Sequence, residues 1–212
     1  MKVSVSSMPS GENILEYVRQ IDDFADFLHC DVCDGHYNST MCFSSDLAKA
    51  VNNISTIPLD VHLMTKNAQR YAEQYIKSGA NIVTAQVESF RGEDEIWDYI
   101  KFVKQKALVG LSLEPETSIE KILPFIKHLD VVLVMSVKTG KSGQKFDESV
   151  FDKIKLLSDL RNKLHFRYKI EVDGGVNDIR ASALKPLGVD IVVSGNYVFN
   201  AKDRKRAIEN LR

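Results

Sequence analysis

The sequence predicts an α/β fold of the (β/α)₈ TIM-barrel class, in a single domain that spans residues 1–212. Short β-rich segments alternate with segments that have the apolar spacing of helices, from one end of the chain to the other. Eight strand-like segments are present and each is followed by a crossover, which favours a parallel sheet. A chain of 212 residues accommodates eight such units in a compact barrel. A doubly wound open sheet is the alternative architecture.

The expected strands are rich in aliphatic and β-branched residues, and in chain order they are Lys2–Ser6, Phe27–Val32, Leu59–Met64, Ile82–Val87, Leu108–Leu113, Val131–Val137, Tyr168–Val172 and Ile191–Ser194. Helices are expected between them, because segments such as 14–24 and 96–103 carry apolar residues at helical spacing. Gly79 and Gly188 precede two of the strands, as is typical where a helix ends and the chain returns to the sheet. The polar segment Lys138–Phe146 is expected to form a long loop.

The composition is that of an ordinary globular protein, with 44% hydrophobic and 27% charged residues. The chain has 28 basic and 29 acidic residues, and its formal net charge of -1 predicts no nucleic-acid partner. The longest apolar runs are too short to cross a bilayer, and the first residues lack the apolar segment of a signal peptide. Three cysteines, an odd number, do not suggest a disulfide framework. We therefore expect a cytoplasmic protein without a membrane partner.

Ionisable side chains cluster at the carboxyl ends of three expected strands, where a barrel places its active site. The strand period of two puts His29 and Asp31 on one face, and in the same way pairs Asp60 with His62. Asp173 ends another strand. Two imidazoles and two carboxylates suit one divalent transition metal ion, such as Zn²⁺, Mn²⁺, Fe²⁺ or Co²⁺.

Ordinary structural roles compete with this metal site. A lone inward histidine is more often a satisfied core residue, and an aspartate at a strand end is commonly the N-cap of the next helix. Asp34 and Asp60 fit that second role as well as a functional one. Cys30 and Cys33 match a C-x-x-C pattern, but on a strand their sulfurs point to opposite faces and cannot share a metal.

Glycine-rich segments follow the last three expected strands, at positions where barrels commonly build a phosphate cradle from backbone N–H groups. They are Gly140–Gln144, Asp173–Asn177 and Ser194–Asn196. Any one of them alone is a weak signal, because glycine in a turn is the ordinary reading. Their occurrence after successive strands indicates a phosphorylated ligand.

These segments together resemble the ribulose-phosphate 3-epimerase family, including its allulose-6-phosphate 3-epimerase branch. The resemblance covers nearly the whole chain and is carried by the segments 29–36, 60–64, 134–137, 143–146, 171–176 and 194–199. It implies a barrel of the ribulose-phosphate-binding type, a ketose phosphate as substrate, and a homo-oligomer, either a dimer or a hexamer. It implies one metal ion per subunit, bound by His29, Asp31, His62 and Asp173. It also implies substrate contacts from Ser6, His62, Met64, Met135, Gly143, Gly174, Gly175, Gly195 and Asn196.

The implied reaction is 3-epimerisation, most directly of D-ribulose 5-phosphate to D-xylulose 5-phosphate. Inverting a carbon next to a ketone means removing its proton from one face and returning a proton to the other. A metal stabilises the enediolate that lies between, and two acid/base groups are needed on its opposite faces. Asp31 and Asp173 can serve as these two groups, and Glu171 would lie beneath Asp173, as an orienting residue or as part of an interior ion pair.

The chain departs from the family pattern mainly around the substrate, at Gly11, Cys33, Asn38–Thr40, Gln86, Glu114, Thr139–Ser142 and Asn196. The family usually has histidine at the position of Gln86, asparagine at Glu114 and proline at Thr139. D-allulose 6-phosphate is therefore the alternative substrate, and a non-catalytic barrel that binds a sugar phosphate is a further alternative. A decarboxylase or aldol-type synthase on the same scaffold is less favoured, because the segment after Asp31 lacks the lysine usual in those barrels.

Overall fold

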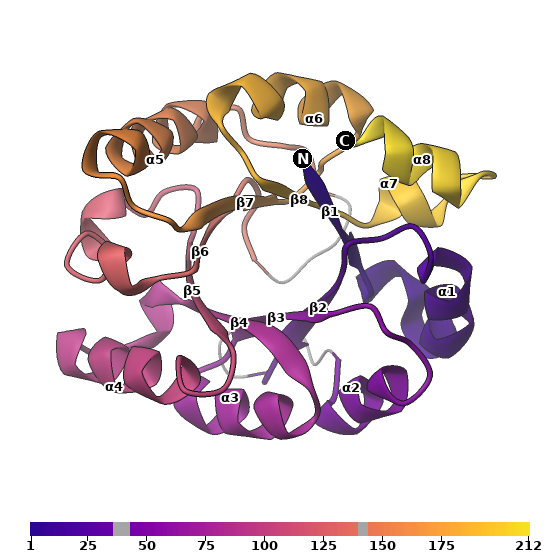
Figure 1. Ribbon diagram of the computed structural model, residues 1–212, viewed down its shortest axis with the longest axis horizontal. Helices are drawn as coiled ribbons and strands as arrows, with labels where there is room; N and C mark the ends of the chain where they lie inside the picture. The colour runs from indigo at the N-terminus through magenta and orange to yellow at the C-terminus, as the bar shows by residue number, and fades with distance from the viewer. Residues whose placement is uncertain (36–42, 140–143) are drawn as a thin grey trace.

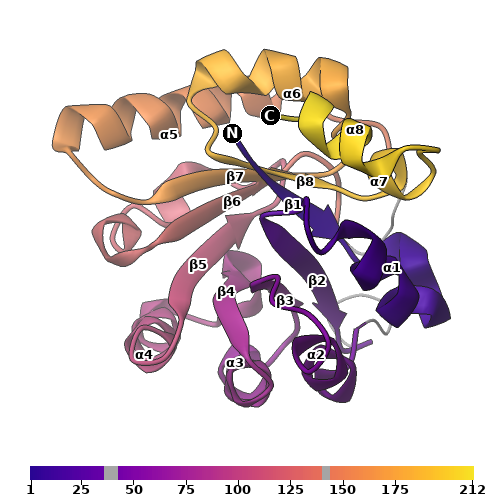
Figure 2. The same cartoon turned by 45° about the vertical axis from the view of Figure 1, so that its right-hand side comes forward.

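Eight parallel strands form a closed ring in the computed structural model, and helices surround the ring (Figure 1). The structure describes residues 1–35, 43–139 and 144–212. The strands are β1 (Lys2–Ser6), β2 (Phe27–Cys33), β3 (Leu59–Met64), β4 (Ala80–Gln86), β5 (Leu108–Leu113), β6 (Val131–Met135), β7 (Lys169–Asp173) and β8 (Ile191–Ser194). Strand order follows the chain, and β1 pairs with β8, so the first and last strands lie side by side (Figure 2). The closed ring confirms the (β/α)₈ barrel and excludes the open sheet.

The helices lie along the outside of the barrel, with α1 to α6 between strands and α7 and α8 after the last strand. They are α1 (Ile14–Ile21), α2 (Ser45–Asn52), α3 (Ala68–Lys77), α4 (Glu93–Val103), α5 (Val150–Leu164), α6 (Asp178–Leu184), α7 (Asn196–Phe199) and α8 (Arg204–Asn210). Between β5 and β6 the connection consists of two 3₁₀ turns, Ile119–Lys121 and Ile126–His128. Side-chain caps begin several helices: Asn67 accepts from the Arg70 N–H of α3, and Asn177 accepts from the Arg180 N–H of α6.

Four strands have the bounds that the sequence predicts, and the others differ by one or two residues at an end. β2 and β7 continue to Cys33 and Asp173, so both include the polar residues that end them. β4 begins at Ala80 and stops before Val87, which is buried but lies in a 3₁₀ turn. The sequence prediction included Val87 because it is apolar. Apolar residues indicate burial, and buried residues continue past the last hydrogen bond between the strands. The expected loop Lys138–Phe146 lies partly outside the described residues, at 140–143.

The apolar core lies between the strands and the helices, and not on the barrel axis. In β2, for example, Leu28, Cys30 and Val32 belong to this outer core, while the alternating residues face inward. The inward set is mainly polar and buried, and includes Ser4, Ser6, His29, Asp31, Asp60, His62, Thr84, Gln86, Ser112 and Glu171. Buried polar groups require partners, so the interior of this barrel is organised by hydrogen bonds and charge.

A partly exposed ion-pair network joins α5, β7 and the residue that precedes β8. The Asp190 carboxylate accepts hydrogen bonds from the Ile170 N–H (2.9 Å), the Lys169 ammonium (3.1 Å) and the Arg161 guanidinium. Arg161 also donates to the Gly188 carbonyl at 2.9 Å. Burial alone would raise the pKa of Asp190, but these bonds outweigh it and hold the pKa below its ordinary value. The pairing therefore favours the folded state whenever this carboxylate is ionised.

We expect Asp190→Asn to lower the free energy of unfolding at pH 7 by about 2 kcal/mol, because it removes a charged acceptor from three donors. Since the folded-state pKa is lowered, the contribution is present above the unfolded pKa, about 3.9, and is lost as the pH falls through the folded value. Urea unfolding of both proteins at pH 7 and at pH 3 measures this. Asp159→Asn, at an exposed position of α5, is the control and should have little effect. An equal loss of stability at both pH values would contradict the charge-based account.

Candidate functional site

Strand register brings the predicted ionisable residues to one level inside the barrel. β2 and β3 pair so that His29 lies beside Asp60 and Asp31 lies beside His62. Asp173 is the last residue of β7 and pairs with Met135 of β6. Because these positions alternate with the outward apolar ones, their side chains converge on the axis at the carboxyl end of the strands.

Four of these side chains form a compact cluster. His29, Asp31, His62 and Asp173 each offer one ligand atom, and all four atoms lie within 4.8 Å of one another. The Asp31 Oδ1 atom is 3.5 Å from His29 Nε2 and 3.4 Å from His62 Nδ1, and His29 Nε2 is 3.8 Å from Asp173 Oδ2. Neighbouring ligands of a tetrahedral ion lie about 3.4 Å apart when each metal–ligand bond is near 2.1 Å. The cluster therefore has the dimensions of a divalent metal site.

The two histidines each have one nitrogen free for a metal and one engaged elsewhere. His29 Nδ1 lies 2.7 Å from the Asp60 carboxylate, and His62 Nε2 lies 3.2 Å from the Ser112 hydroxyl. The opposite nitrogens, His29 Nε2 and His62 Nδ1, are buried without a hydrogen-bond partner among the described residues. Buried polar atoms are rarely left in this state. A metal ion between them would satisfy both, and the outer partners would fix the rings, as in known metal sites.

Asp60 and Glu171 form a layer beneath this cluster. Asp60 accepts a hydrogen bond from the Ser4 hydroxyl at 2.7 Å as well as facing His29, so it orients a cluster residue and does not cap a helix. Asp34, the other possible cap, accepts from the backbone N–H of Lys66. Glu171 is fully buried. Burial and the nearby Asp60 charge raise the pKa of Glu171 well above its ordinary value.

The cluster carboxyl groups have different proton affinities. Burial would raise the pKa of Asp31, but the adjacent His29 and His62 imidazoles outweigh it and hold the pKa below its ordinary value. For Asp173, burial dominates and raises the pKa to about 6. Burial opposes protonation of His29, yet the Asp60 and Asp31 carboxylates raise its pKa well above the ordinary value. Environments that separate the pKa values of two carboxyl groups are typical of acid/base pairs.

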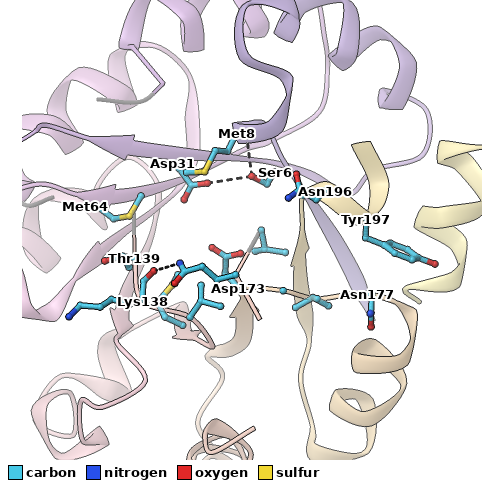
Figure 3. A pocket seen from close by; sticks show the side chains of 18 residues that line it. Ser6, Met8, Asp31, Met64, Lys138, Thr139, Asp173, Asn177, Asn196 and Tyr197 are labelled. Carbon is cyan, nitrogen blue, oxygen red and sulfur yellow. Dashed lines mark hydrogen bonds between the residues drawn. The ribbon is translucent and has the colours of Figure 1, made fainter. Parts of the chain in front are cut away.

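A cavity of about 330 Å³ opens over the cluster. Asp31 and Asp173 point into it from opposite sides, and the Ser6 hydroxyl donates to Asp31 Oδ2 at 3.4 Å (Figure 3). The structure brings most of the predicted substrate residues to its wall, namely Ser6, Met64, Met135, Gly174, Gly175, Gly195 and Asn196. His62 is fully buried behind the wall, and Gly143 lies outside the described residues.

Further wall residues lie in segments that follow the strands. Met8 and Tyr197 line the cavity and were not among the predicted residues, whereas Gln144 and Asn177 end two of the predicted glycine-rich segments and Thr139 begins the segment that departs from the family pattern. Figure 3 labels all of them except Gln144. The sequence signal for Met8 is its position two residues after Ser6, and in the structure its N–H donates to the Ser6 hydroxyl at 3.2 Å. Tyr197 lies in α7, directly after the Gly195 turn, where the sequence signal comes from glycine.

The glycines after β7 are required by close packing. Gly174 and Gly175 have φ angles of 119° and 61°, in the region that favours glycine. A Cβ on Gly175 would lie 2.8 Å from both the Gln144 carbonyl oxygen and the Phe146 nitrogen. The segments after β6 and β7 therefore pack backbone against backbone beside the cavity, which Gln144, Gly174 and Gly175 line.

Fold and cluster together define a barrel protein with a buried His/Asp site, suited to a divalent metal, at the carboxyl end of its strands. The chain belongs to the ribulose-phosphate 3-epimerase family, because the model of that family matches residues 3–199. Ribulose-phosphate 3-epimerase of Helicobacter pylori strain J99 is 35% identical over 215 residues, covering 100% of this chain and 97% of that protein. The Bacillus subtilis strain 168 enzyme of the same name is 35% identical, covering 89% of this chain and 86% of that protein.

Solved structures support the barrel. A 3-hexulose-6-phosphate synthase superposes with a TM-score of 0.70 at 17% identity, covering 100% of this chain and 98% of that one. KGPDC from Streptococcus mutans gives a TM-score of 0.73 at 12% identity, covering 99% and 94%. At such identities the likeness extends to the fold alone. Among the described helices, none combines the length and apolar character needed to cross a bilayer.

Proposed function

We propose that this protein is a metal-dependent 3-epimerase that interconverts D-ribulose 5-phosphate and D-xylulose 5-phosphate. The observation that carries the proposal is the pair of carboxyl groups on opposite sides of one cavity, Asp31 and Asp173, within a cluster of metal-ligating dimensions. The family and the names of its curated relatives indicate the same reaction.

Residues of the chain account for proton transfer on both faces of the substrate. One of Asp31 and Asp173 takes the proton from C3, and the other returns a proton from the opposite side of the planar enediolate. Their separated proton affinities suit one base and one acid. A divalent ion held by His29, Asp31, His62 and Asp173 would supply Lewis-acid stabilisation of the negative charge. Met8, Met64 and Met135 form an apolar wall that excludes water from the reacting carbon.

The phosphate group would bind at the loops after β7 and β8. Gly174, Gly175, Gly195 and Asn196 line the same cavity as the cluster, and the close backbone packing at Gly175 presents main-chain N–H groups there. Ser6 lies between the two halves of the site, with its hydroxyl bonded to Asp31. It would contact the sugar between the phosphate and the metal.

The test is a nuclear magnetic resonance assay in D₂O with metal-loaded protein. D-ribulose 5-phosphate, D-allulose 6-phosphate and 3-hexulose 6-phosphate are supplied separately. We expect epimerisation with incorporation of solvent deuterium at C3, fastest with D-ribulose 5-phosphate. Faster turnover of D-allulose 6-phosphate would identify that sugar as the substrate. Release of formaldehyde from 3-hexulose 6-phosphate would indicate aldol chemistry. Binding without deuterium incorporation in any sugar would contradict an epimerase.

The proposal also covers the identity of the metal ion, the oligomeric state and the cellular location. We infer one Zn²⁺, Mn²⁺, Fe²⁺ or Co²⁺ ion per subunit, since two imidazoles and two carboxylates accept each of these ions. Metal analysis of protein purified without chelators measures the stoichiometry and identity. We also propose a cytoplasmic homo-oligomer, a dimer or hexamer, and light scattering with size-exclusion chromatography distinguishes the two.

A further inference from the structure

A chain of hydrogen bonds leads from the cluster histidine His62 to the loop that follows β6. His62 Nε2 faces the Ser112 hydroxyl at 3.2 Å, and that hydroxyl donates to the Gln86 side-chain carbonyl. Gln86 Nε2 then lies 3.4 Å from Glu114 Oε1. The N–H and the hydroxyl of Thr139, a wall residue of the cavity, both donate to the Glu114 carboxylate.

Three residues of this hydrogen-bond network, Gln86, Glu114 and Thr139, are among the positions at which the sequence departs from the family pattern. They come from β4, from the segment after β5 and from the segment after β6, and the structure joins them in one network. His62, Ser112 and Gln86 are fully buried, so water cannot replace a lost partner.

The carboxylate at the end of the network fixes the direction of every bond in it. An ionised carboxylate only accepts, so Gln86 must turn its NH₂ toward Glu114 and its carbonyl toward Ser112. Ser112 has a single proton, which it gives to Gln86, and toward His62 it can only accept. His62 then carries its proton on Nε2. Its Nδ1 lies 3.4 Å from Asp31 Oδ1, has no hydrogen-bond partner among the described residues, and keeps its lone pair for an ion held between the cluster ligands.

Glu114 is held firmly enough to act in this way. Its N–H donates to the Glu88 carboxylate at 3.0 Å, and the Lys153 ammonium of α5 bonds the Glu114 and Pro115 carbonyls at 2.7 and 2.8 Å. Main-chain contacts therefore anchor the residue on both sides, and its carboxylate is presented to Gln86 and Thr139.

We propose that Glu114 is a positioning residue that, acting through Gln86 and Ser112, holds His62 in the tautomer whose Nδ1 binds the metal. The inference deepens the proposed function and rests on its metal site. Without the carboxylate, the Gln86 amide is free to reverse and the Ser112 hydroxyl to donate to His62 Nε2. The His62 proton would then move to Nδ1 and occupy the metal position.

The experiment compares wild-type protein with Glu114→Ala, Gln86→Leu, Glu114→Gln and the control Glu116→Ala, an exposed glutamate of the same segment. Long-range ¹H–¹⁵N spectra of histidine-labelled, metal-free protein report the tautomer of each histidine. Calorimetric titration with Zn²⁺ alone reports metal affinity. His29, whose Nδ1 faces Asp60, serves as an internal reference in every spectrum.

We expect His62 to shift toward the Nδ1–H tautomer in Glu114→Ala and Gln86→Leu, with Zn²⁺ affinity lowered about tenfold. Glu114→Gln should fall between these and wild type, because its amide oxygen still accepts from Gln86, and it tests the inference if the alanine variant does not fold. Unchanged His62 tautomer and Zn²⁺ affinity in both Gln86→Leu and Glu114→Gln would overturn it. Neither readout uses a substrate. If the tautomer and Zn²⁺ affinity change as expected but the wild-type protein turns over no sugar phosphate, the proposed function is refuted and the role of Glu114 stands.

Discussion

Asp31→Asn and Asp173→Asn are each expected to lower kcat for epimerisation by about 1,000-fold or more. Each substitution removes one of the two groups proposed to exchange a proton with C3, and such a group contributes about 100- to 10,000-fold. Each also replaces a carboxylate of the cluster by an amide, which weakens charge stabilisation in the site. The two variants are assayed with both epimers after metal reconstitution, with bound metal quantified in each sample.

Deuterium exchange distinguishes a mechanism with two proton-transfer groups from a mechanism with one. If Asp31 and Asp173 act on opposite faces, each variant retains the base for one epimer only. Asp31→Asn should then exchange the C3 proton of one pentulose phosphate in D₂O without epimerising it, and Asp173→Asn should exchange that of the other. A single-base enzyme would instead lose exchange of both epimers in one variant and keep both in the other. That result would contradict the two-carboxylate mechanism.

The control for general effects of charge removal is Asp98→Asn, an exposed residue of α4 that is 3.8 Å from Lys101. It should leave kcat within about twofold of wild type, because it lies on the solvent face of a helix. If Asp31→Asn or Asp173→Asn loses its bound metal, the substitution has impaired metal binding as well as proton transfer. The exchange pattern of that variant is then measured at a saturating metal concentration.

The alternation of inward and outward side chains along the strands made the His/Asp cluster predictable from the sequence. His29, Asp31, His62 and Asp173 are ionisable residues in strands whose outward positions are apolar, and period two assigns each of them to the inward face. The barrel closes so that those faces meet, and the expected strand bounds were correct to within one or two residues. The residue types and the period therefore predicted that these side chains meet, and the resemblance to the family supplied their expected roles as metal ligands and acid/base groups.

The network behind His62 could not be found in this way. Gln86 and Ser112 also face inward, but an amide and a hydroxyl in a strand are ordinary, and no motif links them to Glu114. Their partners depend on strand register and on the path of the loop after β5, which alternation does not specify. The same holds for Tyr197, which reaches the cavity through the geometry of the segment after β8.

Gly175→Ala is expected to lower kcat/KM for the phosphorylated substrate by about 100-fold, mainly by raising KM. The added Cβ would lie 2.8 Å from the Gln144 carbonyl oxygen and from the Phe146 nitrogen, and both are backbone atoms that cannot rotate away. The segment that carries Gln144 must then move away from the cavity wall, and displacements near 1 Å in a positioning loop reduce rates by about that factor. Steady-state kinetics, with inorganic phosphate as a competitive inhibitor, give both the KM and the affinity of the cradle.

Gly11→Ala separates crowding from backbone strain. Gly11 also has a positive φ, 52° against 61° for Gly175, but a Cβ there would meet nothing within 4 Å. Both alanine variants should lose about 1 to 3 kcal/mol of stability because their backbone has a positive φ angle, and only Gly175→Ala should lose affinity for phosphate. Similar kinetic losses in the two variants would assign the effect to strain, and unchanged phosphate affinity in Gly175→Ala would move the phosphate site away from the β7 loop.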